Sequence, residues 1–87
     1  MQYITPNMLN YLSFTVDDDM EEADVTLQFL YCGGIVKEIA PQSTLCKCKL
    51  IAAFWLGCNE ITSADSVKLV VEEEVIQTEP IILNTEK

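Results

Sequence analysis

The chain has 87 residues, with 14 Asp or Glu, five Lys, no Arg and no His, so its formal net charge at pH 7 is −9. The lack of histidine excludes imidazole bases, Ser-His and Cys-His nucleophiles and histidine metal ligands. The negative charge and the lack of arginine argue against direct binding to nucleic-acid phosphates. The hydrophobic share of 49% is nevertheless sufficient for a single folded domain that spans residues 1–87.

The N-terminal residues carry no basic or apolar region of the kind found in signal peptides. The longest apolar run, residues 50–56, is far shorter than the roughly 20 residues of a membrane-spanning helix. We therefore expect a cytoplasmic protein, in the producing cell or in an infected host cell, without a membrane partner.

The first element is predicted to be a strand over residues 10–16. Leu12, Phe14 and Val16 alternate with hydroxyl residues, and this period of two is typical of a half-buried strand. The alternative is a short helix that begins at Thr5-Pro6.

The clearest local pattern predicts a β-hairpin over residues 24–39. The apolar residues of its first strand share one face: Val25, Leu27, Phe29 and Tyr31. Gly33-Gly34 supplies the positive φ angles of a two-residue turn, and residues 35–39 form the returning strand.

Residues 44–56 are predicted to form a helix. Pro41 ends the preceding strand, and Ser43 or Thr44 is a suitable N-cap. Gly57 is placed to close the last turn. Apolar residues at helical spacing form the expected core face: Leu45, Cys48, Ala52 and Trp55.

The remaining residues predict a strand, a turn and a return. Residues 67–71 form the strand, Glu72–Glu74 the turn or an exposed edge, and residues 75–76 and 81–83 the return, which Pro80 interrupts. The element order (β)ββαββ predicts an α+β domain, in which one helix packs on a small, mostly antiparallel sheet.

Two motifs precede the strand predicted at residues 67–71. They are Pro41-Gln-Ser-Thr-Leu45 and Thr44-Leu45-x-x-Cys48-Lys49-x-x-Ala52. In this order, the two motifs and the strand resemble a corner, a helix and a strand of the ubiquitin-like β-grasp family, and the resemblance covers residues 25–83. It implies an exposed hydrophobic recognition patch centred on Val70. A member of that family would act as an adaptor that binds proteins.

Two acidic clusters are candidate binding sites: Asp17, Asp18, Asp19, Glu21 and Glu22 form one, and Glu72, Glu73 and Glu74 form the other. Arrays of carboxylates attract a basic partner surface or imitate the phosphates that such a surface binds. One alternative is that both clusters are ordinary solvated loops. Another is a calcium site in the first cluster, which lacks the spacing of an EF-hand.

Trp55 is the second candidate for a contact residue. Adjacent residues of a helix point about 100° apart, so Trp55 and Phe54 are not expected to face the same core layer. One of them is a candidate anchor for a partner or for self-association. The alternative is that both are buried against the sheet and the N-terminal segment.

The four cysteines predict neither a metal site nor a disulfide framework, because they lack paired C-x2-C spacing and a secretory context. We expect small buried thiols and no metal ion or other cofactor. No base or oxyanion array accompanies them, which argues against an enzyme. These residues are Cys32, Cys46, Cys48 and Cys58.

These features together predict a non-catalytic, acidic protein-binding domain that engages a basic surface. In its most specific form it is a virus- or phage-encoded inhibitor that blocks a nucleic-acid-handling protein. The alternative is a ubiquitin-like adaptor that binds through a hydrophobic sheet patch. A further hypothesis is a homodimer formed by edge pairing of residues 10–16 or 81–83 across a two-fold axis.

Overall fold

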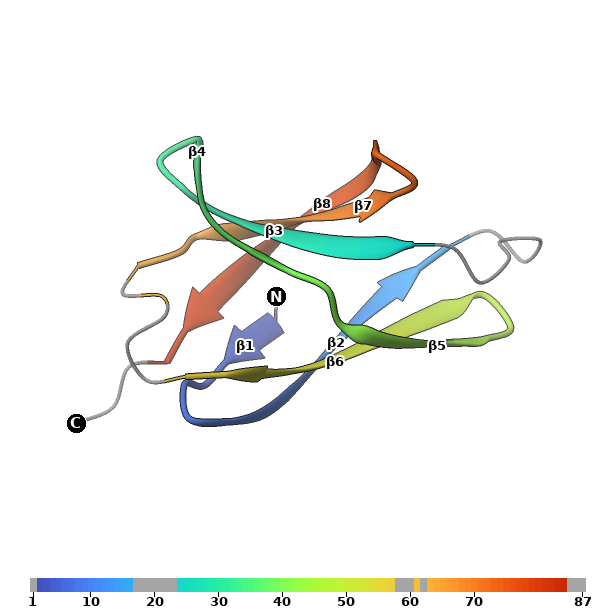
Figure 1. Ribbon diagram of the computed structural model, residues 1–87, viewed down its shortest axis with the longest axis horizontal. Helices are drawn as coiled ribbons and strands as arrows, with labels where there is room; N and C mark the ends of the chain where they lie inside the picture. The colour runs from blue at the N-terminus through green and yellow to red at the C-terminus, as the bar shows by residue number, and fades with distance from the viewer. Residues whose placement is uncertain (1, 17–23, 58–60, 62, 85–87) are drawn as a thin grey trace.

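The computed structural model describes residues 2–16, 24–57, 61 and 63–84 (Figure 1). These residues form eight strands and no helix: β1 (Gln2–Ile4), β2 (Met8–Thr15), β3 (Val25–Tyr31), β4 (Gly34–Ile39), β5 (Gln42–Cys46), β6 (Lys49–Leu56), β7 (Ser66–Val71) and β8 (Glu74–Leu83). The described part of the chain therefore has an all-β fold, and the expected α+β class is wrong. Within the same residues, no helix is long and apolar enough to cross a membrane.

The strands form two sheets that stack as the layers of a sandwich (Figure 1). The larger sheet has the order β1-β8-β7-β3-β4, and the smaller sheet has the order β2-β6-β5. All neighbouring strands are antiparallel except β1 and β8, which are parallel. β4 is an edge strand of the larger sheet, and β5 is an edge strand of the smaller sheet. Ala40-Pro41 joins these two strands, so the chain passes from one sheet to the other at this point.

The hydrophobic core lies between the two sheets. Its largest fully buried side chains come from both layers: Ile4, Leu27, Phe29, Val67 and Leu69 from the larger sheet, and Leu12, Phe14 and Leu56 from the smaller sheet. Successive side chains of a strand point to opposite faces. Each strand can therefore give its apolar residues to this core while its other residues form an outer face.

The predicted helix over residues 44–56 is a β-hairpin formed by β5 and β6. The buried residues of β6 alternate with more exposed ones and are Leu50, Ala52, Phe54 and Leu56. This period of two is matched by β2, which pairs with β6 along its whole length. The helical interpretation placed Cys48 and Trp55 on the core face, whereas both are exposed.

The strands predicted before and after this segment are confirmed. Residues 10–16 fall largely within β2, and residues 67–71 fall within β7. The predicted hairpin is formed by β3 and β4. Its turn is Cys32-Gly33 instead of Gly33-Gly34, with φ angles of 52° and 84°, because Tyr31 already pairs with Gly34.

Pro80 does not interrupt the last strand. It lies opposite Ser66 at the end of the β7 pairing, and the pairing of β8 with β1 begins at the next residue, Ile81. A proline lacks the N–H that a sheet ladder uses. Its position where the partner strand changes explains how β8 continues through it.

Side-chain amides close the side of the sandwich where β1 and β2 meet. The Nε2 of Gln2 donates to the carbonyl of Ser13 at 2.9 Å, and the N–H of Ser13 donates to the Oε1 of Gln2 at 2.8 Å. The Nε2 of Gln77 donates to the carbonyl of Thr15. Main-chain groups at the free edge of β2 are therefore occupied by side chains from the larger sheet.

Candidate functional site

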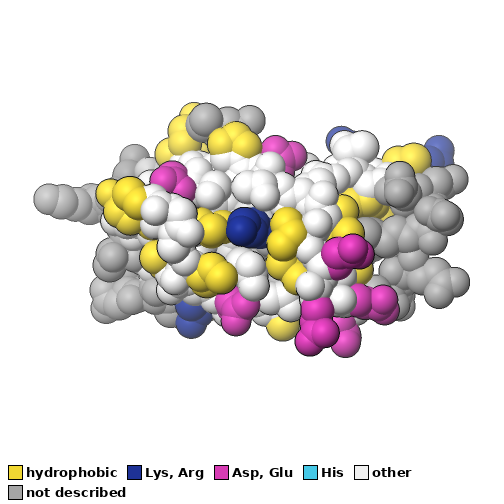
Figure 2. Space-filling model, turned by 90° about the horizontal axis from the view of Figure 1, so that it is seen from above, with side chains coloured by type: hydrophobic (Ala, Val, Ile, Leu, Met, Phe, Trp, Pro, Cys, Tyr) yellow, Lys and Arg dark blue, Asp and Glu magenta, His cyan; other side chains and the backbone are white. Residues whose placement is uncertain are grey.

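The outer face of the larger sheet contains a shallow hollow of about 680 Å³. Its lining comes from strands β3, β4 and β7, from the residue before β3 and from the β7–β8 turn. The lining residues are Asp24, Thr26, Gln28, Glu38, Val70, Glu72 and Glu73. Figure 2 shows this face from above: one group of acidic side chains lies towards one end, other acidic side chains are scattered over the face, and a basic side chain lies near its middle. We call this site the acidic hollow.

Strand register brings these residues together from three distant parts of the chain. Thr26 lies opposite Val70 in the pairing of β3 with β7. Gln28 lies opposite Glu38 in the pairing of β3 with β4, and its Nε2 donates to the Oε2 of Glu38 at 2.7 Å. The floor of the hollow is therefore a small ladder of side chains across β4, β3 and β7.

The turn between β7 and β8 forms the acidic rim. Glu72 and Glu73 both have left-handed backbones, with φ angles of 50° and 68°. The N–H of Glu72 donates to the carbonyl of Asp24 at 3.0 Å. This bond ties the turn to the beginning of β3, so that the acidic residues of both segments border the same space.

The charge of the acidic hollow is one-sided. Four lining residues are carboxylates, namely Asp24, Glu38, Glu72 and Glu73, and none of the described lining residues is basic. Lys68 lies opposite Gln28 in the pairing of β3 with β7, outside this lining. An apolar floor at Val70 with carboxylates around it suits a lysine or arginine side chain, whose stem is apolar and whose end is cationic.

The structure brings together only part of the predicted site. Glu72 and Glu73 line the hollow, while Glu74 is the first residue of β8 and is exposed outside the lining. The predictions for Asp17, Asp18, Asp19, Glu21 and Glu22 concern residues outside the described ranges. Of the two acidic clusters, only Glu72–Glu74 lies within the described residues.

Val70 does not lie at the centre of an exposed hydrophobic patch, as the family resemblance implied. It is only 7% exposed and contributes to the hollow between acidic neighbours. The helix on which the same resemblance depended is the β5–β6 hairpin. Val70 therefore offers a small apolar floor, and its surroundings are polar and charged.

Trp55 is exposed and Phe54 is buried, so the two residues do lie on different sides of their element. Trp55 is 59% exposed on the outer face of the smaller sheet, whereas Phe54 is 4% exposed and belongs to the core. Alternation in a strand, not helical rotation, separates them. Trp55 and the acidic hollow consequently lie on opposite outer faces of the sandwich.

The expectation of buried thiols is wrong for Cys32, Cys46 and Cys48, which are free and exposed. Their position explains the exposure, because Cys32 lies in the β3–β4 turn and the other two flank Lys47 in the β5–β6 turn. Cys58 lies outside the described residues. Among the residues that are described, no three His, Cys, Asp or Glu side chains are grouped to hold a metal ion.

Comparison with protein-family models, with curated proteins and with solved structures gave no match. The chemistry of the acidic hollow is therefore the basis for a functional interpretation.

Proposed function

We propose that this protein is a non-catalytic protein-binding domain that accepts a basic segment of its partner in the acidic hollow. The observation that supports this proposal is the set of four carboxylates around Val70, without a basic residue in the described lining. Such a field speeds the encounter with a cationic surface and disfavours partners that are negatively charged.

In its most specific form, the domain is a virus- or phage-encoded inhibitor of a nucleic-acid-handling protein. A protein that binds nucleic acid presents lysine and arginine side chains to phosphates. The carboxylates of the acidic hollow are anionic in the same way and would occupy those side chains. The cytoplasm of the producing or host cell fits this role, because the exposed free thiols of Cys32, Cys46 and Cys48 suit a reducing compartment.

The backbone of the β7–β8 turn supports a binding role for its glutamates. A two-residue hairpin turn with two positive φ angles strongly prefers Asn-Gly, yet the two positions hold Glu72 and Glu73. Left-handed backbones cost a residue with a side chain of this kind roughly 1 kcal/mol each. Glutamates at these positions are therefore unfavourable for folding but place two carboxylates at the rim.

The experiment that tests the proposal is affinity purification of the partner, followed by binding measurements with two matched variants. Glu73→Gln removes a carboxylate of the hollow, and Glu74→Gln removes the neighbouring carboxylate outside it. We expect the first to weaken binding several-fold at low salt and the second to have little effect. We also expect binding to weaken as salt is raised, because salt screens exposed charges.

The alternative function is an adaptor that binds through the apolar floor at Val70. It predicts binding that is insensitive to salt and to Glu73→Gln but is lost in Val70→Thr. That result would contradict the proposed acidic contact and favour the adaptor.

A further inference from the structure

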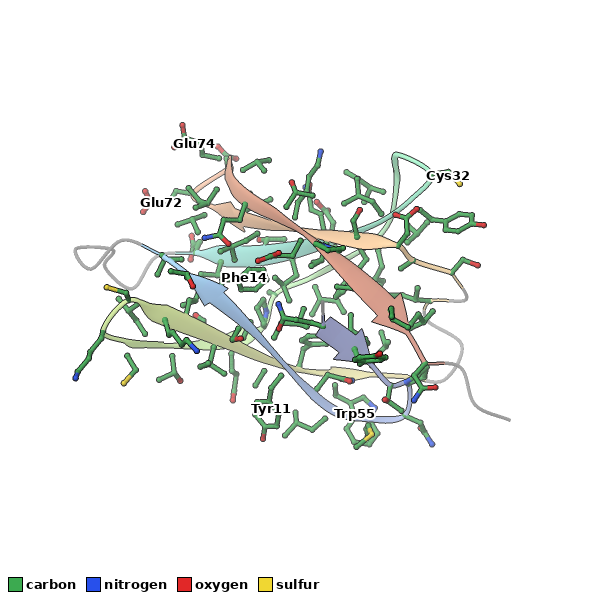
Figure 3. All side chains as sticks on the ribbon, turned by 180° about the vertical axis from the view of Figure 1, so that it is seen from behind. Tyr11, Phe14, Cys32, Trp55, Glu72 and Glu74 are labelled. Carbon is green, nitrogen blue, oxygen red and sulfur yellow. The ribbon has the colours of Figure 1, made fainter. Side chains whose placement is uncertain are left out.

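The outer face of the smaller sheet carries a continuous apolar surface, which we call the aromatic face. It is formed by outward residues of β2 and β6: Leu9, Tyr11, Ile51, Ala53 and Trp55. Leu9, Tyr11 and Trp55 are 46%, 62% and 59% exposed. Figure 3 shows Tyr11 and Trp55 projecting from the smaller sheet on the side away from the larger sheet.

Strand register makes these residues neighbours. Leu9 lies opposite Trp55, and Tyr11 lies opposite Ala53 two positions further along. Tyr11 and Trp55 are therefore diagonal partners, a spacing that large aromatic side chains can bridge. Single exposed apolar residues are ordinary, but a contiguous group of this kind marks an interaction surface.

The distribution of charge indicates which partner this surface takes. The chain carries a net charge of −9, yet β2, β5 and β6 contain no Asp or Glu and only one basic residue, Lys49. Strands of the larger sheet, in contrast, carry three carboxylates, Glu38, Glu74 and Glu79, together with Lys37 and Lys68. Two copies of this chain repel each other, and the described surface of the smaller sheet lets them meet without placing carboxylates opposite carboxylates.

We propose that the aromatic face is the contact between two copies of this chain, packed face to face across a two-fold axis. A two-fold contact uses the same patch twice, so an uncharged apolar patch is complementary to itself. Tyr11 and Trp55 form the centre, and each is of the type that dominates interface energies. Standard interfaces bury roughly 800 Å² per partner. About three-fifths of Tyr11 and of Trp55 is exposed and available for burial, so the rest of the contact must come from the other outward residues of the smaller sheet.

Edge pairing, which the sequence suggested for a dimer, is less favourable. Residues 81–83 do not form an edge, because β8 lies between β1 and β7. In β2, both main-chain groups of Ser13 are occupied by the side chain of Gln2, and the carbonyl of Thr15 is occupied by Gln77. A second chain would have to displace these bonds to add a strand there.

The test combines sedimentation velocity with the fluorescence of Trp55, the only tryptophan of the chain. As the protein concentration rises, we expect a monomer–dimer transition and a shift of the Trp55 emission to shorter wavelength with the same midpoint. Added salt should strengthen the dimer, because it screens the repulsion between two acidic copies. This response is opposite to that expected for the acidic hollow, so failure of one proposal can be told from failure of the other.

Two matched variants locate the contact. Thr44→Glu adds a carboxylate on β5 beside the aromatic face, opposite Ile51, and Thr78→Glu makes the same change at an exposed position of β8 in the larger sheet. We expect Thr44→Glu to weaken the dimer at least tenfold and Thr78→Glu to change it less than threefold. Circular dichroism confirms that both variants fold. A monomer at every concentration, a dimer that leaves the Trp55 emission unchanged, or equal effects of the two variants would overturn the proposal.

Discussion

Phe29 and Phe54 face each other across the sandwich, with ring centroids 5.6 Å apart and ring planes inclined by 56°. Phe29 belongs to β3 of the larger sheet and Phe54 to β6 of the smaller sheet. Both are buried. The contact therefore joins the two layers directly, in a tilted geometry that aromatic pairs favour.

We expect Phe54→Ala to lower the free energy of unfolding by about 3–5 kcal/mol, because it leaves a cavity between the sheets. Phe54→Leu should lose less than about 2 kcal/mol, since it keeps most of the volume. Urea unfolding followed by circular dichroism measures both values. A loss below about 1 kcal/mol for the alanine variant would mean that Phe54 does not lie between the two layers.

The β7–β8 turn should be easy to stabilise. Glu72→Asn combined with Glu73→Gly places the preferred residues in two left-handed positions, so we expect a gain of about 1–2 kcal/mol in unfolding free energy. The same double variant should bind the partner more weakly, because it removes two carboxylates from the hollow. Thermal unfolding and a binding titration measure the two effects.

Cys32 provides a control for this turn effect. It occupies the first position of the β3–β4 turn, with a φ angle of 52°, and Gly33 already follows it. Cys32→Asn should raise stability by a few tenths of a kcal/mol to about 1 kcal/mol without any effect on partner binding. If the Glu72 and Glu73 double variant proved less stable than the wild type, the two glutamates would not be unfavourable for folding at these left-handed positions.

Asn10 should be essential for stability although it is polar. It is only 7% exposed. Its Oδ1 accepts from the N–H of Thr5 at 2.8 Å, and its Nδ2 donates to the carbonyls of Thr5 and Met8 at 2.9 and 3.0 Å. Asn10→Ala leaves these main-chain groups without their partner, so we expect a loss of about 2–3 kcal/mol.

Ser13→Ala is the control for Asn10, because Ser13 is exposed and uses its main chain to bind Gln2. It should change the unfolding free energy by less than about 0.5 kcal/mol. Equal losses in the two variants would show that Asn10 does not organise the link between β1 and β2.

Thiol chemistry should distinguish the exposed cysteines from the buried thiols that the sequence predicted. Cys32, Cys46 and Cys48 are free and exposed. We expect at least three of the four thiols to react rapidly with a disulfide reagent in the folded protein. The count in denaturant gives the total, and a native protein with no rapidly reacting thiol would contradict the placement of these hairpin turns.

The β3–β4 hairpin could be predicted because its signals are local. An alternating strand, a turn with glycine and a second apolar run follow one another within 15 residues of the chain, from Val25 to Ile39. The position of the turn was one residue off, since Cys32 takes a positive φ angle that glycine was expected to supply. Local alternation therefore identified the hairpin, and the register of its two strands decided the turn.

The helix over residues 44–56 was predicted wrongly because its apolar residues satisfy two periods at once. Leu50, Ala52, Phe54 and Leu56 have the spacing of a strand, while Ala52 and Trp55 also fit a helical face. Such short apolar runs are ambiguous from periodicity alone. The partner strand β2, more than 30 residues earlier in the sequence, decides between the two periods by pairing with β6.

Of the residues that line the acidic hollow, only Glu72, Glu73 and Val70 were among the predicted site residues. Asp24 lies two residues after Glu22 but was not counted with the first acidic cluster, and Glu38 is a single carboxylate that follows Lys37. They reach the hollow through the pairing of β3 with β4 and with β7. Composition and spacing do not give the register between strands that are distant in the sequence. The contribution of Asp24 and Glu38 to the hollow could therefore not be predicted.

The acidic hollow and the aromatic face lie on opposite outer faces of the sandwich, which has a consequence for valency. A dimer that buries the aromatic face leaves both hollows open, and they point away from each other. Such a dimer is bivalent, but it cannot place both hollows on one compact partner, so it gains no avidity from a single basic site. It would instead bridge two partner molecules, and on a partner with repeated basic segments it would form cross-linked assemblies.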